Sequence, residues 1–151
     1  MDAKTKIDPV VKKLTLKAPC EKAFRHFTDN IHLWWPLRSH SLAEENAATV
    51  KFEAKVGGRI YEIEKSGAER EWGQVSACEV PHRLVFSWVL EKPADATEVE
   101  VSFEANGEGA CVMTLIHRGW DDRSDGQVWR DNYHTGWDGV LQAYTESIGT
   151  N

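Results

Sequence analysis

His117 is the residue in this sequence that is best placed to do chemistry. It ends the apolar segment CVMTLIH, and the two-residue period of a β-strand places Cys111, Met113 and Leu115 on its face. A histidine on such a face can hydrogen-bond a ligand or donate a proton to it. The alternative is a structural histidine that bonds to backbone or to the nearby loop GWDDRSDG, and the sequence alone leaves both interpretations open.

The aromatic residues form a second candidate group, since the chain of 151 residues contains seven tryptophans. Buried Trp and Tyr carry polar atoms that need partners, whereas Leu, Ile and Val would fill a dry core more simply. Small-molecule pockets are typically apolar with a few aimed polar groups, and the alternative is plain core packing. The residues concerned are Tyr61, Trp72, Trp88, Tyr133, Trp137 and Tyr144.

Trp34 and Trp35 are adjacent, so they cannot share one face of a helix or strand. One can turn inward over the end of the fold, while the other lies against the preceding helix or in solvent. Pro36 ends this segment. The pair is either a core plug or, with the polar residues 38–41 (RSHS), a lid on the mouth of a cavity.

Covalent or metal-dependent catalysis has little support. The sequence contains no GxSxG, HExxH or P-loop motif. His26, His32 and His40 do not have the spacing of metal ligands. Cys20 lies in the first turn of a predicted helix, where the pKa of a thiol can be lowered, but it also belongs to the buried face of that helix. We therefore predict no catalytic residue, no metal ligand and no cofactor.

Composition bounds the class of protein. Hydrophobic residues make up 41% and charged residues 28%, and the net charge of −6 argues against a nucleic-acid surface. The three cysteines are an odd number without CxxC spacing, which fits a reducing compartment. The chain has no apolar signal region at its start and no apolar run of about 18 residues. We expect a cytoplasmic protein without a membrane span; the oligomeric state is not predicted.

The elements that position these residues follow from hydrophobic spacing. Residues 10–18 read as a strand, residues 19–27 as a helix, and residues 31–35 as a second, short helix that Asn30 can cap. Short turns then separate successive strands, which implies an antiparallel meander. The six predicted strands are 49–56, 59–65, 70–80, 83–91, 97–105 and 110–118.

Alternation assigns the faces of these strands. In 97–105 the apolar residues share one face and the glutamates share the other, so the sheet has a dry and a wet face. We assign Glu62 and Glu64 to a solvated face. In 83–91 the residues assigned to the dry face are Leu84, Phe86, Trp88 and Leu90.

A long amphipathic helix is predicted over 126–148, where apolar residues recur at spacings of three and four. Gly136 and Gly139 are poor helix residues. Gly136 adjoins the aromatic stripe, which indicates close approach to the sheet or to something held against it. This helix must cover the dry face of the sheet.

The predicted fold is therefore an α+β helix-grip. A curved antiparallel sheet of about seven strands wraps around the long C-terminal helix, and two short helices follow the first strand. One domain spans 9–148, with flexible tails at 1–8 and 149–151.

The order of elements resembles the START-like (SRPBCC) superfamily, and the motifs look like its branch named for activators of a heat-shock chaperone ATPase. The motifs cover nearly the whole chain in the family's order. CEVPHR departs from the pattern, since the family often has two prolines there. The matching segments are APCEKAFRHFTD, WWP, GGRIYE, GQVSACEVPHRLVFSW, VSFEANGEGACVMTLIHRGW and YHTGWDGVLQAY.

The resemblance implies a hydrophobic pocket between the sheet and the C-terminal helix. Members of the superfamily bind lipids, sterols, polyketides or plant metabolites, and a few are cyclases or hydrolases. The chaperone name belongs to eukaryotic relatives in which this fold is one part of a longer protein.

We expect non-enzymatic binding of a small, largely hydrophobic molecule. The alternatives are a module that binds a heat-shock chaperone through its outer surface, around Glu98, Glu100 and Glu104, and an enzyme of the cyclase or hydrolase type. The expected ligand-binding residues are Trp34, Trp35, Tyr61, Trp72, Phe86, Trp88, Met113, Leu115, His117, Tyr133, Trp137 and Tyr144.

Overall fold

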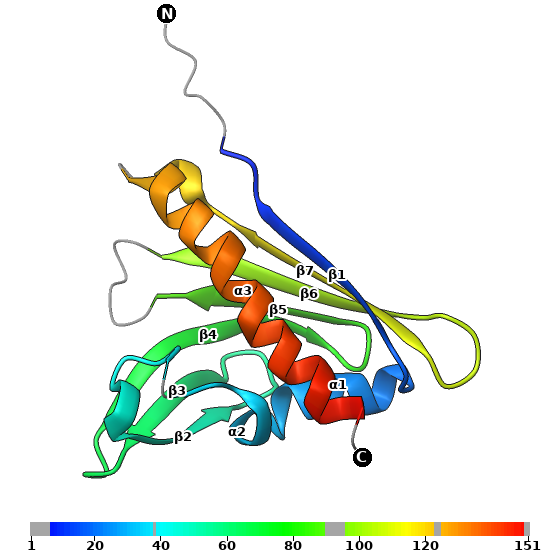
Figure 1. Cartoon of the computed structure of the whole chain (residues 1–151), viewed down its shortest axis with the longest axis horizontal. Helices are drawn as coiled ribbons and strands as arrows, with labels where there is room; N and C mark the ends of the chain where they lie inside the picture. Colours follow the sequence, from blue (N-terminus) through cyan, green and yellow to red (C-terminus); the bar gives the residue numbers. More distant parts are fainter. Residues whose placement is uncertain (1–6, 38, 90–95, 123–124, 150–151) are drawn as a thin grey trace, which may run out of the picture.

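The computed structural model describes residues 7–37, 39–89, 96–122 and 125–149. Figure 1 shows a curved sheet with one long helix lying across its concave face. The elements are β1 (Val10–Leu16), α1 (Cys20–Thr28), α2 (Ile31–Trp34), the 3₁₀ helix η1 (Glu44–Asn46), β2 (Ala47–Phe52), β3 (Arg59–Glu64), β4 (Glu69–Glu79), β5 (Arg83–Trp88), β6 (Thr97–Ala105), β7 (Cys111–Arg118), the 3₁₀ helix η3 (Trp120–Asp122) and α3 (Gly126–Gly149).

The sheet has seven strands in the order β1-β7-β6-β5-β4-β3-β2, and the neighbouring strands are antiparallel. β2 to β7 therefore form a meander, and β1 pairs with the last strand, β7. Helix α3 covers the concave face, while α1 and α2 lie near its C-terminal end (Figure 1). This arrangement confirms the predicted α+β helix-grip fold.

The alternation in β6 and β7 places their apolar side chains against α3. Val99, Val101 and Phe103 of β6 are buried, and so is every second residue of β7 from Cys111 to His117. The register sets Val99 opposite His117, which brings the imidazole to the inner face of the sheet. The predicted dry faces of these two strands are confirmed. In β5 the predicted dry-face residues Leu84, Phe86 and Trp88 are also buried, and Leu90 lies outside the described residues.

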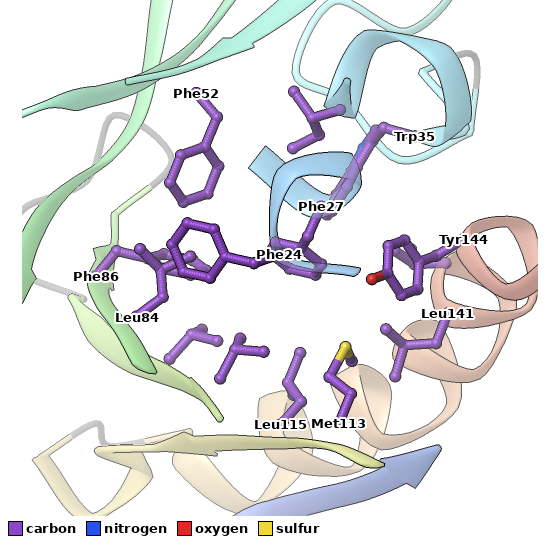
Figure 2. Close-up of a cluster of buried hydrophobic side chains, with 14 of the residues drawn as sticks. Phe24, Phe27, Trp35, Phe52, Leu84, Phe86, Met113, Leu115, Leu141 and Tyr144 are labelled. Atoms are coloured by element: carbon purple, nitrogen blue, oxygen red, sulfur yellow. The ribbon is translucent and has the colours of Figure 1, made fainter. Parts of the chain in front are cut away.

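The end of the fold where α1 and α2 lie near the C-terminus of α3, which we call the closed end of the grip, is filled by the protein's own side chains. Phe27 of α1 packs against Phe103 and Tyr144, with ring centroids 6.4 and 5.5 Å apart. The Tyr144 hydroxyl donates a 2.6 Å hydrogen bond to the Ala23 carbonyl, which ties α3 to α1. Figure 2 shows Tyr144 and Leu141 reaching into this cluster from the helix side. The space between sheet and helix is therefore mostly solid core.

Two local expectations need correction. Asn30 precedes α2 but makes no side-chain cap; its amide lies 3.4 Å from Nδ1 of His26 instead. The strand expected over 49–56 is the shorter β2, Ala47–Phe52, which begins directly after η1.

The predicted tails are described only in part. Residues 1–6 and 150–151 lie outside the described residues. The backbone N–H of Ile7 bonds to Asp121, and the Arg130 guanidinium bonds to the carbonyl of Asp8.

Candidate functional site

A pocket of about 200 Å³ opens between α3, the segment that follows α2, and the inner face of β5. It lies where the core is incomplete, against the middle of α3. Indole rings from three different elements meet at it, and the segment 40–42 forms its rim. Its lining residues are Trp35, His40, Ser41, Leu42, Trp88, Tyr133, Gly136, Trp137 and Val140.

Three tryptophans make a continuous aromatic wall. The ring centroids of Trp35 and Trp88 are 5.9 Å apart, those of Trp35 and Trp137 are 5.9 Å apart, and those of Trp88 and Trp137 are 6.0 Å apart. The three residues come from the end of α2, from β5 and from α3. At these distances the rings contact one another directly, so a ligand has room beside the wall and none between its members.

Each indole N–H of this wall is already bonded within the protein. Trp35 Nε1 donates to the His40 carbonyl at 2.7 Å. Trp88 Nε1 donates to the Tyr133 hydroxyl at 2.9 Å, and Trp137 Nε1 donates to Nδ1 of His117 at 3.0 Å. An indole has a single donor. The wall therefore presents carbon and π surface to the pocket.

His117 lies behind this wall and is fully buried. Because the Trp137 indole can only donate, Nδ1 of His117 accepts and the ring carries its proton on Nε2, 2.7 Å from the Thr97 hydroxyl. Burial lowers the pKa of His117 to about 3. Both ring nitrogens are thus occupied by protein groups, which favours the structural interpretation of this histidine.

The adjacent tryptophans point to different places. Trp34 Nε1 donates to the His26 carbonyl at 2.8 Å, and its ring centroid lies 4.9 Å from that of Tyr144. Trp34 is therefore part of the closed core. Trp35 turns to the other side, where it packs on Trp72 at 5.0 Å and lines the pocket.

Glu62 belongs to the site, although its sequence pattern does not predict this. It is fully buried, which corrects its assignment to a solvated face. Its Oε1 accepts from Trp72 Nε1 and from the Leu42 N–H, both at 2.6 Å, and its Oε2 accepts from the Ala43 N–H at 2.9 Å. The carboxylate therefore fastens the pocket rim to β3 through charge-assisted hydrogen bonds.

Tyr61 does not join the other aromatic residues. It lies on the outer face of β3, where the Arg59 guanidinium sits 4.2 Å from its ring centroid, and it lines a groove of mixed polarity along β2. The expectation that Tyr61 faces the cavity was wrong by one residue of register. No local pattern identifies Glu62 as buried, because its partners Leu42, Ala43 and Trp72 are 10 to 20 positions away in the chain.

Gly136 lines the pocket from α3. A Cβ built on Gly136 meets nothing within 4 Å. The glycine therefore leaves room for a pocket occupant, and it does not mark close approach to the sheet. Gly139, one turn further on, has equally open surroundings but lies on the exposed side of α3.

The other predicted site residues lie in the core. They are fully or nearly fully buried, and they do not line the pocket. They are Trp72, Phe86, Met113, Leu115 and Tyr144.

The residues that the structure describes were also compared with the features of membrane-spanning helices and metal sites. No helix in them has the length and apolarity to cross a membrane. Their His, Cys, Asp and Glu side chains form no group of three that could hold a metal ion.

The family of the chain follows from comparison with known proteins. The family model described as Activator of Hsp90 ATPase homolog 1-like protein matches residues 17–146. Curated proteins give no significant match.

Solved structures share the fold over almost the whole chain. The anthrahydroquino-γ-pyrone synthase Txn09 is 32% identical, with a TM-score of 0.65, covering 93% of this chain and 97% of its own. CalC from Micromonospora echinospora, a self-sacrificing resistance protein, is 27% identical, with a TM-score of 0.72, covering 93% and 94%. An HSP90 activator from Plasmodium falciparum is 23% identical, with a TM-score of 0.55, covering 74% and 73%, which shows a common fold.

The helix-grip architecture and the match over residues 17–146 lead to the same result. This chain belongs to the family of Activator of Hsp90 ATPase homolog 1-like proteins, within the START-like superfamily.

Proposed function

We propose that this protein binds a small, flat, largely apolar molecule in the pocket beside Trp35, Trp88 and Trp137, without changing it chemically. The observation that carries the proposal is the aromatic wall, whose indole donors are all bonded within the protein. Such a wall favours ring stacking, worth about 0.5–1.5 kcal/mol per aromatic pair beyond buried area. A ligand that depends on indole hydrogen bonds is disfavoured.

The volume limits the size of the ligand. Pockets for drug-sized molecules usually have about 300–1,000 Å³, and this one has about 200 Å³. We therefore favour a ring system that fills the pocket or extends from it into solvent, over a fully enclosed sterol or fatty acid. His40, Ser41 and Tyr133 at the pocket supply the polar groups for orientation.

The name of Txn09 denotes a fused aromatic product, and this agrees with an aromatic ligand class. It also keeps an enzymatic alternative open. For such an activity His117 is a poor proton donor, because it is buried and both nitrogens are bonded. Tyr133 and His40 are then the residues to test.

Two glycine substitutions on one helix test the binding proposal. Gly136→Leu fills the pocket, whereas Gly139→Leu adds the same side chain to the exposed side of α3. We would titrate anthraquinones, flavonoids, a fatty acid and a sterol, reading tryptophan fluorescence and the thermal midpoint. At about 100 times its dissociation constant a ligand stabilises the fold by roughly 2.7 kcal/mol.

The expected result is saturable quenching by a flat aromatic compound that Gly136→Leu abolishes and Gly139→Leu retains. Equal binding by both variants would move the site elsewhere and overturn the proposal. The bound compound should be recovered with unchanged mass. A changed mass would replace binding with the enzymatic alternative.

A second candidate is a chaperone partner, which the family description favours. This role would use the outer face of β6, where Glu98 and Glu100 pair with Arg118. Stimulation of an Hsp90 ATPase that is lost in Glu98→Ala/Glu100→Ala but kept in Gly136→Leu would support it. The free cysteines Cys20, Cys78 and Cys111 suit a reducing compartment, so a cytoplasmic location is part of both proposals.

A further inference from the structure

Two cysteines that are far apart in the sequence meet in the fold. Cys20 is the first residue of α1 and Cys111 is the first residue of β7, and their sulfur atoms are 2.9 Å apart. The third cysteine, Cys78, lies elsewhere, with its thiol 3.5 Å from the Ala54 carbonyl. All three are free thiols.

The two sulfur atoms lie close to bonding distance. An S–S bond is about 2.05 Å long, so the two sulfurs need to approach by less than about 1 Å. Both residues are held by regular structure, since Cys111 pairs with Leu16 of β1 and Ala105 of β6. Bond formation therefore needs only a small movement of the two side chains or of the start of α1, and the pairing of the sheet can stay unchanged.

The two thiols differ in access. Cys20 is half-buried and Cys111 is fully buried. Burial raises the pKa of Cys111 to about 12, and the hydrogen bond with Cys20 adds to this shift. Cys111 therefore stays protonated, and Cys20 is the thiol that an oxidant reaches first.

We propose that Cys20 and Cys111 form a redox site at which a hydroperoxide closes a disulfide between α1 and β7. The Cys20 sulfur attacks the peroxide oxygen, the O–O bond breaks, and the alcohol leaves with a proton, so that Cys20 becomes a sulfenic acid. The Cys111 sulfur then attacks the Cys20 sulfur, the S–O bond breaks, and water leaves with the Cys111 proton. Two thiols are oxidised, and the peroxide is reduced to alcohol and water.

The disulfide would join α1 covalently to β7 at the closed end of the grip. It cross-links residues 91 positions apart, and a loop of that length lowers the entropy of the unfolded chain strongly. Helix α1 also contacts α3 through the bond from Tyr144 to Ala23. Neither cysteine lines the pocket, so oxidation should change stability and leave the pocket wall in place.

The test uses the Cys78→Ser variant, in which only the pair remains. Treatment with an equimolar amount of tert-butyl hydroperoxide should remove both titratable thiols of the denatured chain and lower the monomer mass by two hydrogens. The thermal midpoint should rise by roughly 10 °C. Dithiothreitol should reverse all three changes, and Cys20→Ser/Cys78→Ser should show none of them.

Other oxidation products would overturn the proposal. A mass gain of two oxygens on Cys20, a disulfide-linked dimer, or two thiols that persist at equimolar peroxide would each do so. If the Cys20→Ser/Cys78→Ser chain does not fold, Cys20→Ala/Cys78→Ser takes its place, since Cys20 is half-buried and Ala keeps the helix.

Discussion

The indole Nε1 of Trp137 donates a 3.0 Å hydrogen bond to Nδ1 of His117. This bond joins the aromatic wall of the pocket to the sheet behind it. The path continues from Nε2 of His117 to the Thr97 hydroxyl, which lies 3.4 Å from the Trp88 carbonyl. His117 thus orients Trp137 directly and meets the backbone of Trp88 through Thr97, so we regard it as a positioning residue.

The first prediction concerns the protonation state of His117. Nitrogen NMR of the imidazole should show a proton on Nε2 and none on Nδ1 at pH 7, because Trp137 fills the Nδ1 acceptor. The pattern should persist down to pH 5, since burial lowers the pKa of His117 to about 3. A proton on Nδ1, or a titration between pH 7 and pH 5, would contradict the bond from Trp137.

The second prediction is a loss of stability in acid. Burial lowers the pKa of His117 to about 3, so this histidine stays neutral in the fold while the unfolded chain takes up a proton there below about pH 6.5. The free energy of unfolding should therefore fall as the pH drops below this value, by up to about 1.4 kcal/mol per pH unit for His117. Burial also lowers the pKa of His26, which acts in the same direction.

Urea unfolding between pH 7 and pH 5 measures this slope. His117→Gln removes one titrating group and should lower the slope by up to about 1.4 kcal/mol per pH unit. An unchanged slope in a folded variant would show that His117 is protonated equally in both states.

The fold could be predicted because its patterns are local. β6 alternates strictly between valine or phenylalanine and polar residues, and α3 keeps one apolar stripe over its whole length, so each identifies its buried face. In β3 both parities mix polar and apolar residues, and the register with β4 shifts between Ile60 and Tyr61. Alternation therefore cannot identify the buried face of β3. Tyr61 was expected inside and Glu62 outside, and the structure has them the other way round.

The site was only partly predictable for a different reason. Trp35, Trp88, Tyr133 and Trp137 were expected together and do line one pocket. Which acceptor each indole reaches depends on residues 5 to 45 positions away in the chain. Sequence spacing carries no information about such contacts. That all three indole N–H groups are bonded within the protein can therefore be seen only in the folded structure.

The third prediction concerns the buried carboxylate at the pocket rim. Glu62→Gln replaces an acceptor by an amide NH₂ that faces one of three N–H groups, those of Leu42, Ala43 and Trp72. We expect a loss of roughly 3 kcal/mol in the free energy of unfolding. The amides of Leu42 and Ala43 should exchange with solvent much faster.

Glu64→Gln is the matched control on the same strand. Its carboxylate is partly exposed and lies 3.9 Å from the Arg70 guanidinium, so the loss should stay below about 1 kcal/mol. If the amides of Leu42 and Ala43 remain equally protected in both variants, Glu62 does not hold the rim.

The fourth prediction separates stability from binding at Gly136. A Cβ has open space at Gly136 and at Gly139, so each Gly→Ala change should raise the free energy of unfolding by up to about 1 kcal/mol through helix propensity. Only the methyl group added at position 136 enters the pocket. Gly136→Ala should therefore be more stable and should bind a flat aromatic ligand more weakly, while Gly139→Ala should be more stable with unchanged affinity.

Denaturant unfolding and fluorescence titration of the same two preparations measure the free energy of unfolding and the affinity. Unchanged or tighter binding by Gly136→Ala would mean that the space beside this glycine is not where the ligand lies, because a ligand stacked on the Trp137 side of α3 must meet the added methyl group.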